Sequence, residues 1–234
     1  MSFGILSALL DEQRALLAQL QEPQRHERGG RVYWRGALSG HDVVLATSGI
    51  GKVAAAATTT TLVEAFGVNR LVFTGVAGGI ASEVQVGDVV VGTGFVQHDM
   101  DCSPLFARYE LPGYGQSVLA ADPLLSGLLL QACHAVQLNT HQGLIASGDR
   151  FVSRAGEAAE LFQALAQVAL LPYAVEMECA AVAQVCKDYA IPFAAVRTIS
   201  DRADAQAHGD FAYFVKHVAS HTSHAILSRL LNLL

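Results

Sequence analysis

Acidic side chains follow three apolar segments of this sequence. Glu12 comes shortly after FGILSALL, Glu178 follows YAVEM, and Asp201 follows IPFAAVRTIS. Charged side chains are rarely buried unless they are paired or hydrogen-bonded, so their position beside such runs needs an explanation. Carboxyl groups that share a pocket but differ in environment can separate the roles of acid and base. The pattern therefore indicates acid–base chemistry.

The same residues also have plain structural interpretations. Glu12 and Glu178 could lie in the first turns of helices, where negative charge is favourable, and Asp201 could close a turn. If the three strands are parallel, however, their carboxyl ends meet at one edge of a sheet. The side chains would then converge on one pocket, with Asp149 after GLIASG as a fourth. Because burial among so many Ala, Val and Ile residues requires compensation, the shared pocket is the favoured interpretation.

Two glycine clusters lie near these strands. SGIGKVA, residues 48–54, fits the G-x-G-x-x-A pattern of dinucleotide sites, but it does not follow the first strand and no acidic residue ends the next one. It is not a phosphate-binding P-loop either, because Lys52 is followed by Val53. TGVAGG, residues 74–79, ends a buried strand, where glycine allows close approach of a ligand or forms a tight turn.

Short apolar runs alternate with segments of helical period along the chain. Strands are expected within 3–10, 31–38, 41–49, 69–79, 87–99, 143–149, 173–177 and 191–201, and helices within 11–20, 52–67, 153–167, 178–190 and 210–234. Segments 31–38 and 41–49 should form a hairpin with Ser39-Gly40 at its bend. This alternation predicts an α/β fold with a largely parallel, buried sheet, and no linker divides the chain, so we expect one domain over residues 1–234.

Composition excludes several classes of partner. The 234 residues are 52% hydrophobic and carry a formal net charge of -6, and no basic run is present, which argues against binding to nucleic acid or to an anionic membrane. Apolar runs end well short of a membrane span, and no signal peptide is evident. None of the four cysteines forms a C-x-x-C pair, so we expect no zinc cluster and a reduced, cytoplasmic protein.

Six segments together resemble a known family. SGIGKVAAA, TGVAGG, VGDVVV, SGDRF, AVEMECAAVA and VRTISDRAD are similar, in order and over nearly the whole chain, to the bacterial 5′-methylthioadenosine/S-adenosylhomocysteine nucleosidases of the purine nucleoside phosphorylase superfamily. The resemblance implies a single three-layer α/β domain with a mixed, partly barrel-like sheet, and usually a homodimer. It also implies hydrolysis of the bond between adenine and a 5′-thio-substituted ribose, without a metal or organic cofactor.

The resemblance assigns a role to each matching residue. Asp201 matches the general acid that protonates the departing adenine, and Glu12 matches the carboxylate that activates water. Glu178 matches the residue that binds the ribose 2′- and 3′-hydroxyls. The remaining matches are substrate-binding or supporting groups: Met177 under the sugar, Phe151 stacked on adenine, Val152 at the base edge through its backbone, Arg197 and Ser200 beside Glu178 and Asp201, and Ile50 and Phe211 along the alkylthio group.

The expected chemistry accounts for the residue types. Adenine leaves poorly unless it is protonated, so an acid must keep its proton near neutral pH, and burial raises the pKa of a carboxyl group such as Asp201. The sugar gains positive charge as the bond breaks, and ionised Glu12 and Glu178 would stabilise that charge. For Glu176 we expect a structural role, as partner of an arginine or a backbone amide.

The chain departs from the family pattern at Val76, where many members have serine. Valine cannot hydrogen-bond a sugar hydroxyl, a phosphate or a water molecule, which disfavours a phosphorylase. The segment 100–117 also differs in its middle from the common form, and in the family this region shapes the 5′ pocket, partly across the dimer interface. Two alternatives remain: a phosphate-dependent nucleoside phosphorylase, for which no basic cluster lies near the amino terminus, and a non-catalytic nucleoside-binding protein on the same fold.

Overall fold

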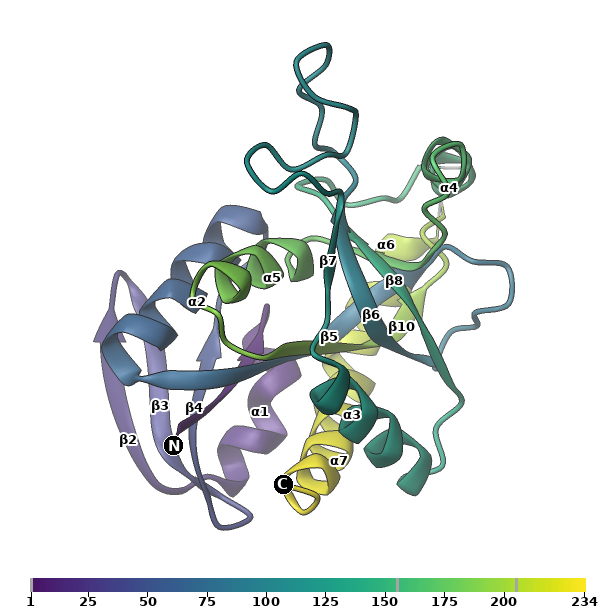
Figure 1. The fold of residues 1–234 in the computed structure, drawn as a ribbon. Helices are drawn as coiled ribbons and strands as arrows, with labels where there is room; N and C mark the ends of the chain where they lie inside the picture. The colour runs from purple at the N-terminus through teal and green to yellow at the C-terminus, as the bar shows by residue number, and fades with distance from the viewer. Residues whose placement is uncertain (1, 155, 205) are drawn as a thin grey trace.

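The computed structural model describes residues 2–154, 156–204 and 206–234. These residues form ten strands that belong to one sheet, together with helices on both of its sides (Figure 1). The strands are β1 (Ser2–Ser7), β2 (Gln21–Arg28), β3 (Arg31–Leu38), β4 (His41–Thr47), β5 (Val68–Gly79), β6 (Val89–Gln97), β7 (Val118–Ala120), β8 (Thr140–Ser147), β9 (Pro172–Glu176) and β10 (Phe193–Asp201). The helices are α1 (Leu10–Gln19), α2 (Lys52–Phe66), α3 (Pro123–Ala135), α4 (Glu157–Ala166), α5 (Cys179–Asp188), α6 (Ala207–Phe214), the π-helical turn η1 (Val215–Ala219) and α7 (Ser220–Leu231).

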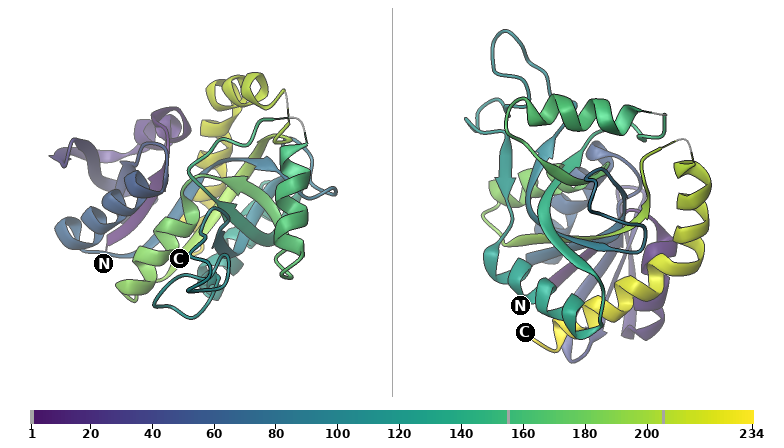
Figure 2. Two further views of the ribbon diagram at one scale, coloured as in Figure 1. Left: turned by 90° about the horizontal axis from the view of Figure 1, so that it is seen from above. Right: turned by 90° about the vertical axis from the view of Figure 1, so that its right-hand side faces the viewer.

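Half of the sheet closes on itself. The strand order is β10-β6-β8-β9-β5-β1-β4-β3-β2, and β10 also pairs with β5, so β5, β10, β6, β8 and β9 form a ring. From β5 the sheet continues as an open wing through β1, β4, β3 and β2. The right-hand view of Figure 2 looks onto the curved strands of the ring. The predicted mixed, partly barrel-like α/β fold is confirmed.

The expectation of a largely parallel sheet is wrong. The β1–β4, β1–β5, β5–β10, β6–β8 and β8–β9 pairs are parallel, whereas β2–β3, β3–β4, β5–β9, β6–β7 and β6–β10 are antiparallel. The apolar strands suggested parallel pairing because they are covered on both faces. Closure of the ring buries antiparallel strands equally well, so burial alone could not distinguish the two arrangements.

Two apolar layers lie on opposite faces of the open wing. Along β1, Leu6 packs toward α2 and α5, whereas Ile5 packs toward α1, α3 and α7. The same alternation on β5 sends Phe73 to the first side and Val72 to the second. Figures 1 and 2 show the two helix groups on either side of the sheet, which gives the three layers. Strand side chains alternate between faces, so a run of apolar residues is required where both faces are covered.

Local sequence signals explain several element ends. The hairpin of β3 and β4 turns at Ser39 and Gly40, both with positive φ, as expected. Helix α2 ends at Gly67, whose φ of 64° is the left-handed conformation that glycine adopts most readily.

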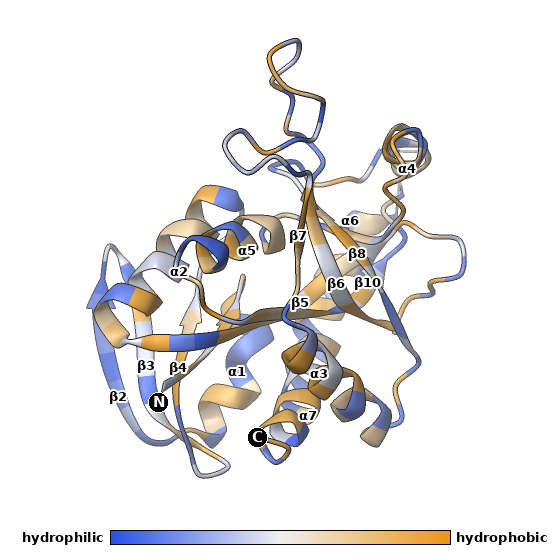
Figure 3. Ribbon diagram, in the orientation of Figure 1, coloured by the Kyte–Doolittle hydropathy of each residue, from blue (hydrophilic) through white to orange (hydrophobic). Residues whose placement is uncertain are grey.

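Strand β2 was not expected, because its residues are mostly exposed and polar; it is coloured largely hydrophilic in Figure 3. Among the described residues, no helix is long and apolar enough to cross a membrane.

Candidate active site

A cavity of about 330 Å³ opens where β1, β5, β9 and β10 approach one another. Asp149, expected as a fourth acid of the pocket, does not line it; every other residue predicted for the site does, and the lining also includes Ala8, Leu9, Ala77, Gly78, Arg150, Val175, Glu176 and His208. The predicted residues are Glu12, Ile50, Val76, Phe151, Val152, Met177, Glu178, Arg197, Ser200, Asp201 and Phe211. The structure therefore brings together side chains that are almost 200 positions apart in the chain.

Strand direction accounts for only part of this convergence. β1, β5 and β10 are parallel, so their carboxyl ends meet as expected, with Asp201 opposite Gly78. β9 runs antiparallel to β5, with Val175 opposite Gly78, and so delivers Glu176 and Glu178 from the opposite direction. Ring closure, which the strand pattern did not indicate, brings these glutamates to the same cavity.

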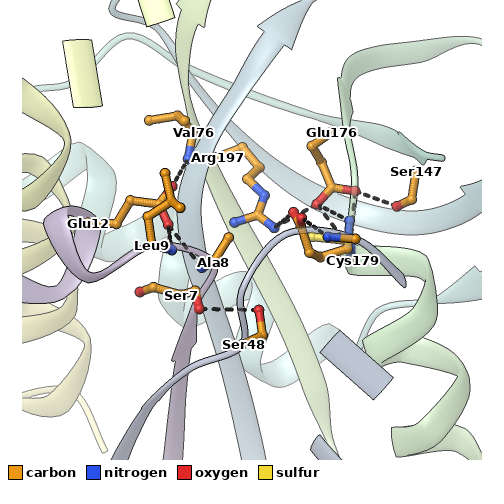
Figure 4. A network of polar contacts seen from close by, with 12 residues as sticks. Ser7, Ala8, Leu9, Glu12, Ser48, Val76, Ser147, Glu176, Cys179 and Arg197 are labelled. Atoms are coloured by element: carbon orange, nitrogen blue, oxygen red, sulfur yellow. Dashed lines mark hydrogen bonds and ion pairs between the residues drawn. The ribbon is translucent and has the colours of Figure 1, made fainter. Parts of the chain in front are cut away.

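Glu12 is held by main-chain amides at the junction of β1 and α1. Its Oε2 accepts hydrogen bonds from the N–H groups of Ala8 at 2.9 Å and Leu9 at 2.8 Å, and its Oε1 accepts one from Val76 at 3.0 Å (Figure 4). Burial raises the pKa of Glu12, although the nearby charge of Arg197 and the three amides oppose this rise. The carboxyl group is thus fixed in position, yet its affinity for a proton is increased.

Arg197 and Glu176 form a buried ion pair beneath the cavity. Arg197 Nη2 lies 2.6 Å from Glu176 Oε2, and both side chains are almost fully buried. Glu176 also accepts hydrogen bonds from the Ser147 hydroxyl and from the Cys179 amide (Figure 4). Burial alone would raise the pKa of Glu176, but the Arg197 charge and these donors outweigh it, so the pKa lies below its ordinary value. The expected structural role of Glu176 is confirmed.

Glu178 has the opposite environment, although it is only two residues away. Its Oε1 accepts a hydrogen bond from the Gly51 amide at 2.8 Å, and its Oε2 lies 3.9 Å from Arg197, which is already bound to Glu176. Burial and the negative charge of Glu176 raise the pKa of Glu178 to about 8. These surroundings favour the protonated form of Glu178, whereas the role expected from the sequence used its ionised form.

Asp201 ends β10 and is buried. The Ser200 hydroxyl donates to its Oδ2 at 2.7 Å, and the Ala203 amide donates to its Oδ1 at 2.8 Å. Burial raises its pKa, and the negative charges of Asp204 and Asp210 add to the rise, which outweighs both hydrogen bonds. The raised pKa favours the protonated form of Asp201, which a general acid requires.

Aromatic side chains form another wall of the cavity. The ring of Phe151 contacts Phe211 and His208 edge to face, with centroids 5.5 Å and 5.9 Å away. Val152 is buried beside it, whereas Ile50 is exposed at the cavity mouth. Flat apolar faces of this kind suit a planar ring.

The TGVAGG segment is not a turn but the end of β5, and its residues Val76, Ala77 and Gly78 line the cavity. A Cβ atom at Gly75 would lie 2.4 Å from Arg197 Nη1 and 2.8 Å from Glu12 Oε1, and one at Gly78 would lie 3.0 Å from Asp201 Oδ1. The glycines therefore make room for the charged side chains of the site. Val76, between them, packs into an apolar cluster with Phe214, Val215 and Ala219.

Two polar side chains of the lining were not anticipated. His208 lies in a helix with no distinctive motif, so no sequence signal indicated it. Arg150 lies within SGDRF, where functional roles were predicted only for its neighbours Asp149 and Phe151. Arg150 pairs with Glu157 at the start of α4. Among the described residues, no group of three or more His, Cys, Asp or Glu side chains is arranged to hold a metal ion.

Comparisons with known proteins decide the family. The sequence pattern of the phosphorylase superfamily matches residues 2–232. The chain belongs to this superfamily. A Bacillus cereus member, 5′-methylthioadenosine/S-adenosylhomocysteine nucleosidase, is 35% identical over 230 residues, which cover 97% of each chain.

Solved structures of superfamily members share the fold along the entire chain. The S-adenosylhomocysteine nucleosidase of Streptococcus pyogenes, in complex with 5-methylthiotubericidin, is 34% identical with a TM-score of 0.93, covering 100% of this chain and 97% of that one. The futalosine hydrolase of Helicobacter pylori is 31% identical with a TM-score of 0.91, covering 100% and 98%. The fold expected from the sequence resemblance is thus confirmed by structure as well.

Proposed function

We propose that this protein hydrolyses the N-glycosidic bond of 5′-methylthioadenosine, S-adenosylhomocysteine or both, releasing adenine and the 5′-thio-ribose. The observation that carries the proposal is the meeting of Glu12, Glu178 and Asp201 around one cavity. The names of the relatives that match the whole chain support the same substrates. The volume of the cavity, about 330 Å³, lies at the lower end of the range of small-molecule pockets.

Asp201 supplies the proton that adenine needs in order to leave. Its pKa is raised, so it carries a proton under conditions in which an ordinary aspartate is ionised. The Ser200 hydroxyl and the Ala203 amide fix its two oxygens, which aims the acid at the base. Proton transfer of this kind accelerates a reaction by about a hundred- to ten-thousand-fold.

Glu12 acts at the opposite reacting group, the water molecule. Its three amide donors hold the carboxylate without using any side chain, and they orient it toward the cavity. Once ionised, Glu12 takes a proton from the water that attacks the sugar, and its negative charge stabilises the positive charge on the ribose in the transition state.

Glu178 binds the ribose hydroxyls, and Met177 packs under the sugar. The raised pKa of Glu178 means that its protonated carboxyl group can both donate and accept a hydrogen bond. Two neighbouring hydroxyl groups offer the same combination. Arg197 and Glu176 support this carboxyl group from below, since their ion pair fixes the start of α5.

The apolar walls bind the remainder of the nucleoside. Phe151 stacks on adenine, and the backbone of Val152 contacts the edge of the base. Ile50 and Phe211 line the alkylthio group. Exposure of Ile50 at the mouth fits the outward end of the substrate.

Hydrolysis is favoured over phosphorolysis by the charges of the lining. The lining contains two arginines: Arg197 is bound to Glu176, and Arg150 pairs with Glu157. Buried Glu12 would repel phosphate, and Val76 offers no side-chain donor. Arg197, the buried arginine of the lining, is therefore not available to hold a phosphate ion at the sugar.

The direct experiment is incubation with a panel of nucleosides, with and without phosphate, followed by measurement of the free base. The panel contains 5′-methylthioadenosine, S-adenosylhomocysteine and adenosine, and also futalosine because of the similarity to a futalosine hydrolase. Release of adenine from the thio-nucleosides at a rate independent of phosphate supports the proposal. Phosphate dependence with ribose 1-phosphate as product identifies a phosphorylase, and binding without release identifies a non-catalytic binding protein.

We further propose a cytoplasmic homodimer. Apolar side chains that are exposed in the single chain occur at the cavity mouth and in segment 100–117, namely Ile50, Val53, Leu105 and Phe106. Burying such a patch against a second copy would remove apolar surface from water. Analytical ultracentrifugation tests this assembly: a species of twice 24.7 kDa supports it, and a 24.7 kDa species at micromolar concentration contradicts it.

A further inference from the structure

A closed set of hydrogen bonds links three segments outside the cavity. The Lys52 amide donates to Asp149 Oδ1 at 2.7 Å, and the Asp149 amide donates to Asp99 Oδ2 at 2.9 Å. The Lys52 ammonium group then donates to Asp99 Oδ1 at 2.6 Å, which completes the cycle. The three residues belong to the start of α2, the segment after β6 and the segment after β8. We refer to Lys52, Asp99 and Asp149 as the tethering triad.

Two of the three segments joined by the triad, those of Lys52 and Asp149, adjoin the cavity. Gly51, beside Lys52, donates its amide to Glu178, while Arg150, Phe151 and Val152 follow Asp149 directly and line the cavity. The amide of Gly51 and the ring of Phe151 therefore depend on contacts that lie outside the cavity itself. No side chain of the triad lines the cavity.

Asp99 is the centre of the triad, because it accepts from both of the other residues. Asp99 lies near the surface, with about a third of its side chain exposed. Although partial burial tends to raise its pKa, the hydrogen bonds from Lys52 and Asp149 and the Lys52 charge bring the pKa below its ordinary value. Lys52 is well covered and also donates to Gln97 Oε1 at 3.0 Å. Hydrogen bonds between charged groups are about twice as strong as neutral ones, so this connection is well suited to fixing loops.

The main chain just before Asp149 is tightly packed, so it has little room to move. A Cβ atom at Gly148 would lie 2.3 Å from His98 Nε2, so the main chain lies directly against that ring. The His98 amide donates to the Ser147 carbonyl at 2.9 Å, and the Gly148 amide donates to the Glu176 carbonyl at 3.1 Å. The loop that carries Phe151 is thus fixed up to Asp149, and the triad extends this restraint to α2.

We propose that Asp99 and Lys52 are positioning residues for nucleoside binding, which act by holding the Gly51 amide against Glu178 and the ring of Phe151 against the base. This proposal rests on the function proposed above. Because the Gly51 and Phe151 contacts exist before and during the reaction, they contribute equally to binding of the ground state and the transition state. Their loss therefore raises KM with little change in kcat.

The experiment compares Asp99→Asn with Asp42→Asn. Asp42 is the control, since it too accepts two hydrogen bonds and pairs with a basic side chain, but both of its hydrogen bonds come from Arg35 on the β3–β4 hairpin. Asparagine keeps the shape of Asp99 and loses one of its two acceptors. We expect KM to rise at least about tenfold in Asp99→Asn, with kcat within about threefold, and neither to change in Asp42→Asn. Unchanged KM in Asp99→Asn overturns the proposal, as does an equal rise in the control.

Variants at Lys52 supply a second comparison that is independent of Asp99. Lys52→Met removes the cation and keeps the length of the side chain, so it should raise KM in the same way, and Lys52→Arg should recover at least half of the loss in kcat/KM. If Asp99→Asn does not fold, the Lys52 pair decides the proposal. Equal kinetics of Lys52→Met and the wild type contradict it.

Hydrogen exchange separates this proposal from the proposed function. In Asp99→Asn, amides of residues 49–52 and 148–152 should exchange faster than in the wild type, while those of β1 remain protected. This result does not require any substrate. If the wild type releases no base from any nucleoside, the proposed function fails, yet faster exchange in both segments still supports the triad. Unchanged exchange at 49–52 overturns it.

Discussion

At the scale of single residues, Glu176 and Glu178 are carboxyl groups of the same type with opposite properties. Glu176 receives Arg197 and several hydrogen bonds, whereas Glu178 receives one amide and the repulsion of Glu176. Because both residues are glutamates, the sequence alone cannot reveal this difference in pKa. What the sequence did indicate was that a pair of acids in an apolar run requires a partner, and Arg197 provides it.

The raised pKa of Glu178 predicts a gain in stability when the carboxyl group is removed. A group whose pKa rises from 4.5 to about 8 on folding favours the folded state below pH 4.5, and this contribution is lost as the pH rises toward 8. Glu178→Gln, which keeps an acceptor for Gly51, should therefore increase the melting temperature by a few degrees at pH 8 and much less at pH 4.

Glu176→Gln is the control for this prediction, and its sign is reversed. The pKa of Glu176 is lowered, so its contribution to stability is present above the ordinary value of 4.5 and is lost as the pH falls through the folded-state pKa. Removing its charge also leaves Arg197 buried without a counter-ion, and breaking such a pair costs about 3–5 kcal/mol. Thermal melts of both variants across this pH range test the signs; destabilisation of Glu178→Gln at pH 8 contradicts the assignment.

At the scale of elements, β5 contributes space rather than side chains to the charged part of the site. Gly75→Ala places a Cβ atom against Arg197 and Glu12, so we expect a loss of about 1–3 kcal/mol in the free energy of unfolding and a fall in kcat/KM of more than about tenfold. Gly127→Ala on α3 is the control, because nothing lies within 4 Å of its added Cβ atom, and alanine there should stabilise the helix by about 0.5–1 kcal/mol. Denaturant unfolding and initial rates measure both; similar behaviour of the two variants contradicts the steric role of Gly75.

Elements with both a periodic pattern and a boundary signal were predicted well from the sequence. Helix α2 with Gly67 at its end and the hairpin at Ser39-Gly40 are examples. Strand β2 was missed because an exposed edge strand such as QEPQRHER has no apolar face to reveal it. The helix expected within 153–167 begins later than its pattern suggested, since α4 starts at Glu157 after Gly156.

At the scale of the whole molecule, closure of the ring is what the sequence could not reveal from its own patterns. The pairing of β10 with β5 joins residues more than a hundred positions apart, and no local preference encodes it. The family resemblance supplied the barrel and the site residues instead. Glu12, Arg197 and Asp201 are all buried at the cavity, because the parallel strands β1, β5 and β10 end there.

The shared cavity also predicts how the rate depends on pH. Glu12 must be ionised to activate water, so kcat/KM should rise as the pH increases through its pKa, and Asp201 must be protonated, so kcat/KM should fall above its pKa. Burial raises both pKa values, which moves the bell-shaped profile from acidic pH toward neutrality. Initial rates with 5′-methylthioadenosine, measured from pH 4 to pH 9 in steps of about half a pH unit, test this prediction. A flat profile is inconsistent with both roles.

The measurement that tests the account most directly is the turnover of 5′-methylthioadenosine by Asp201→Asn. Asparagine cannot supply the proton, so kcat should fall by about a hundredfold or more, while nucleoside affinity by calorimetry and the melting temperature stay close to those of the wild type and of Asp42→Asn. Near-normal turnover in this variant would contradict Asp201 as the acid, and with it the chemistry assigned to the cavity.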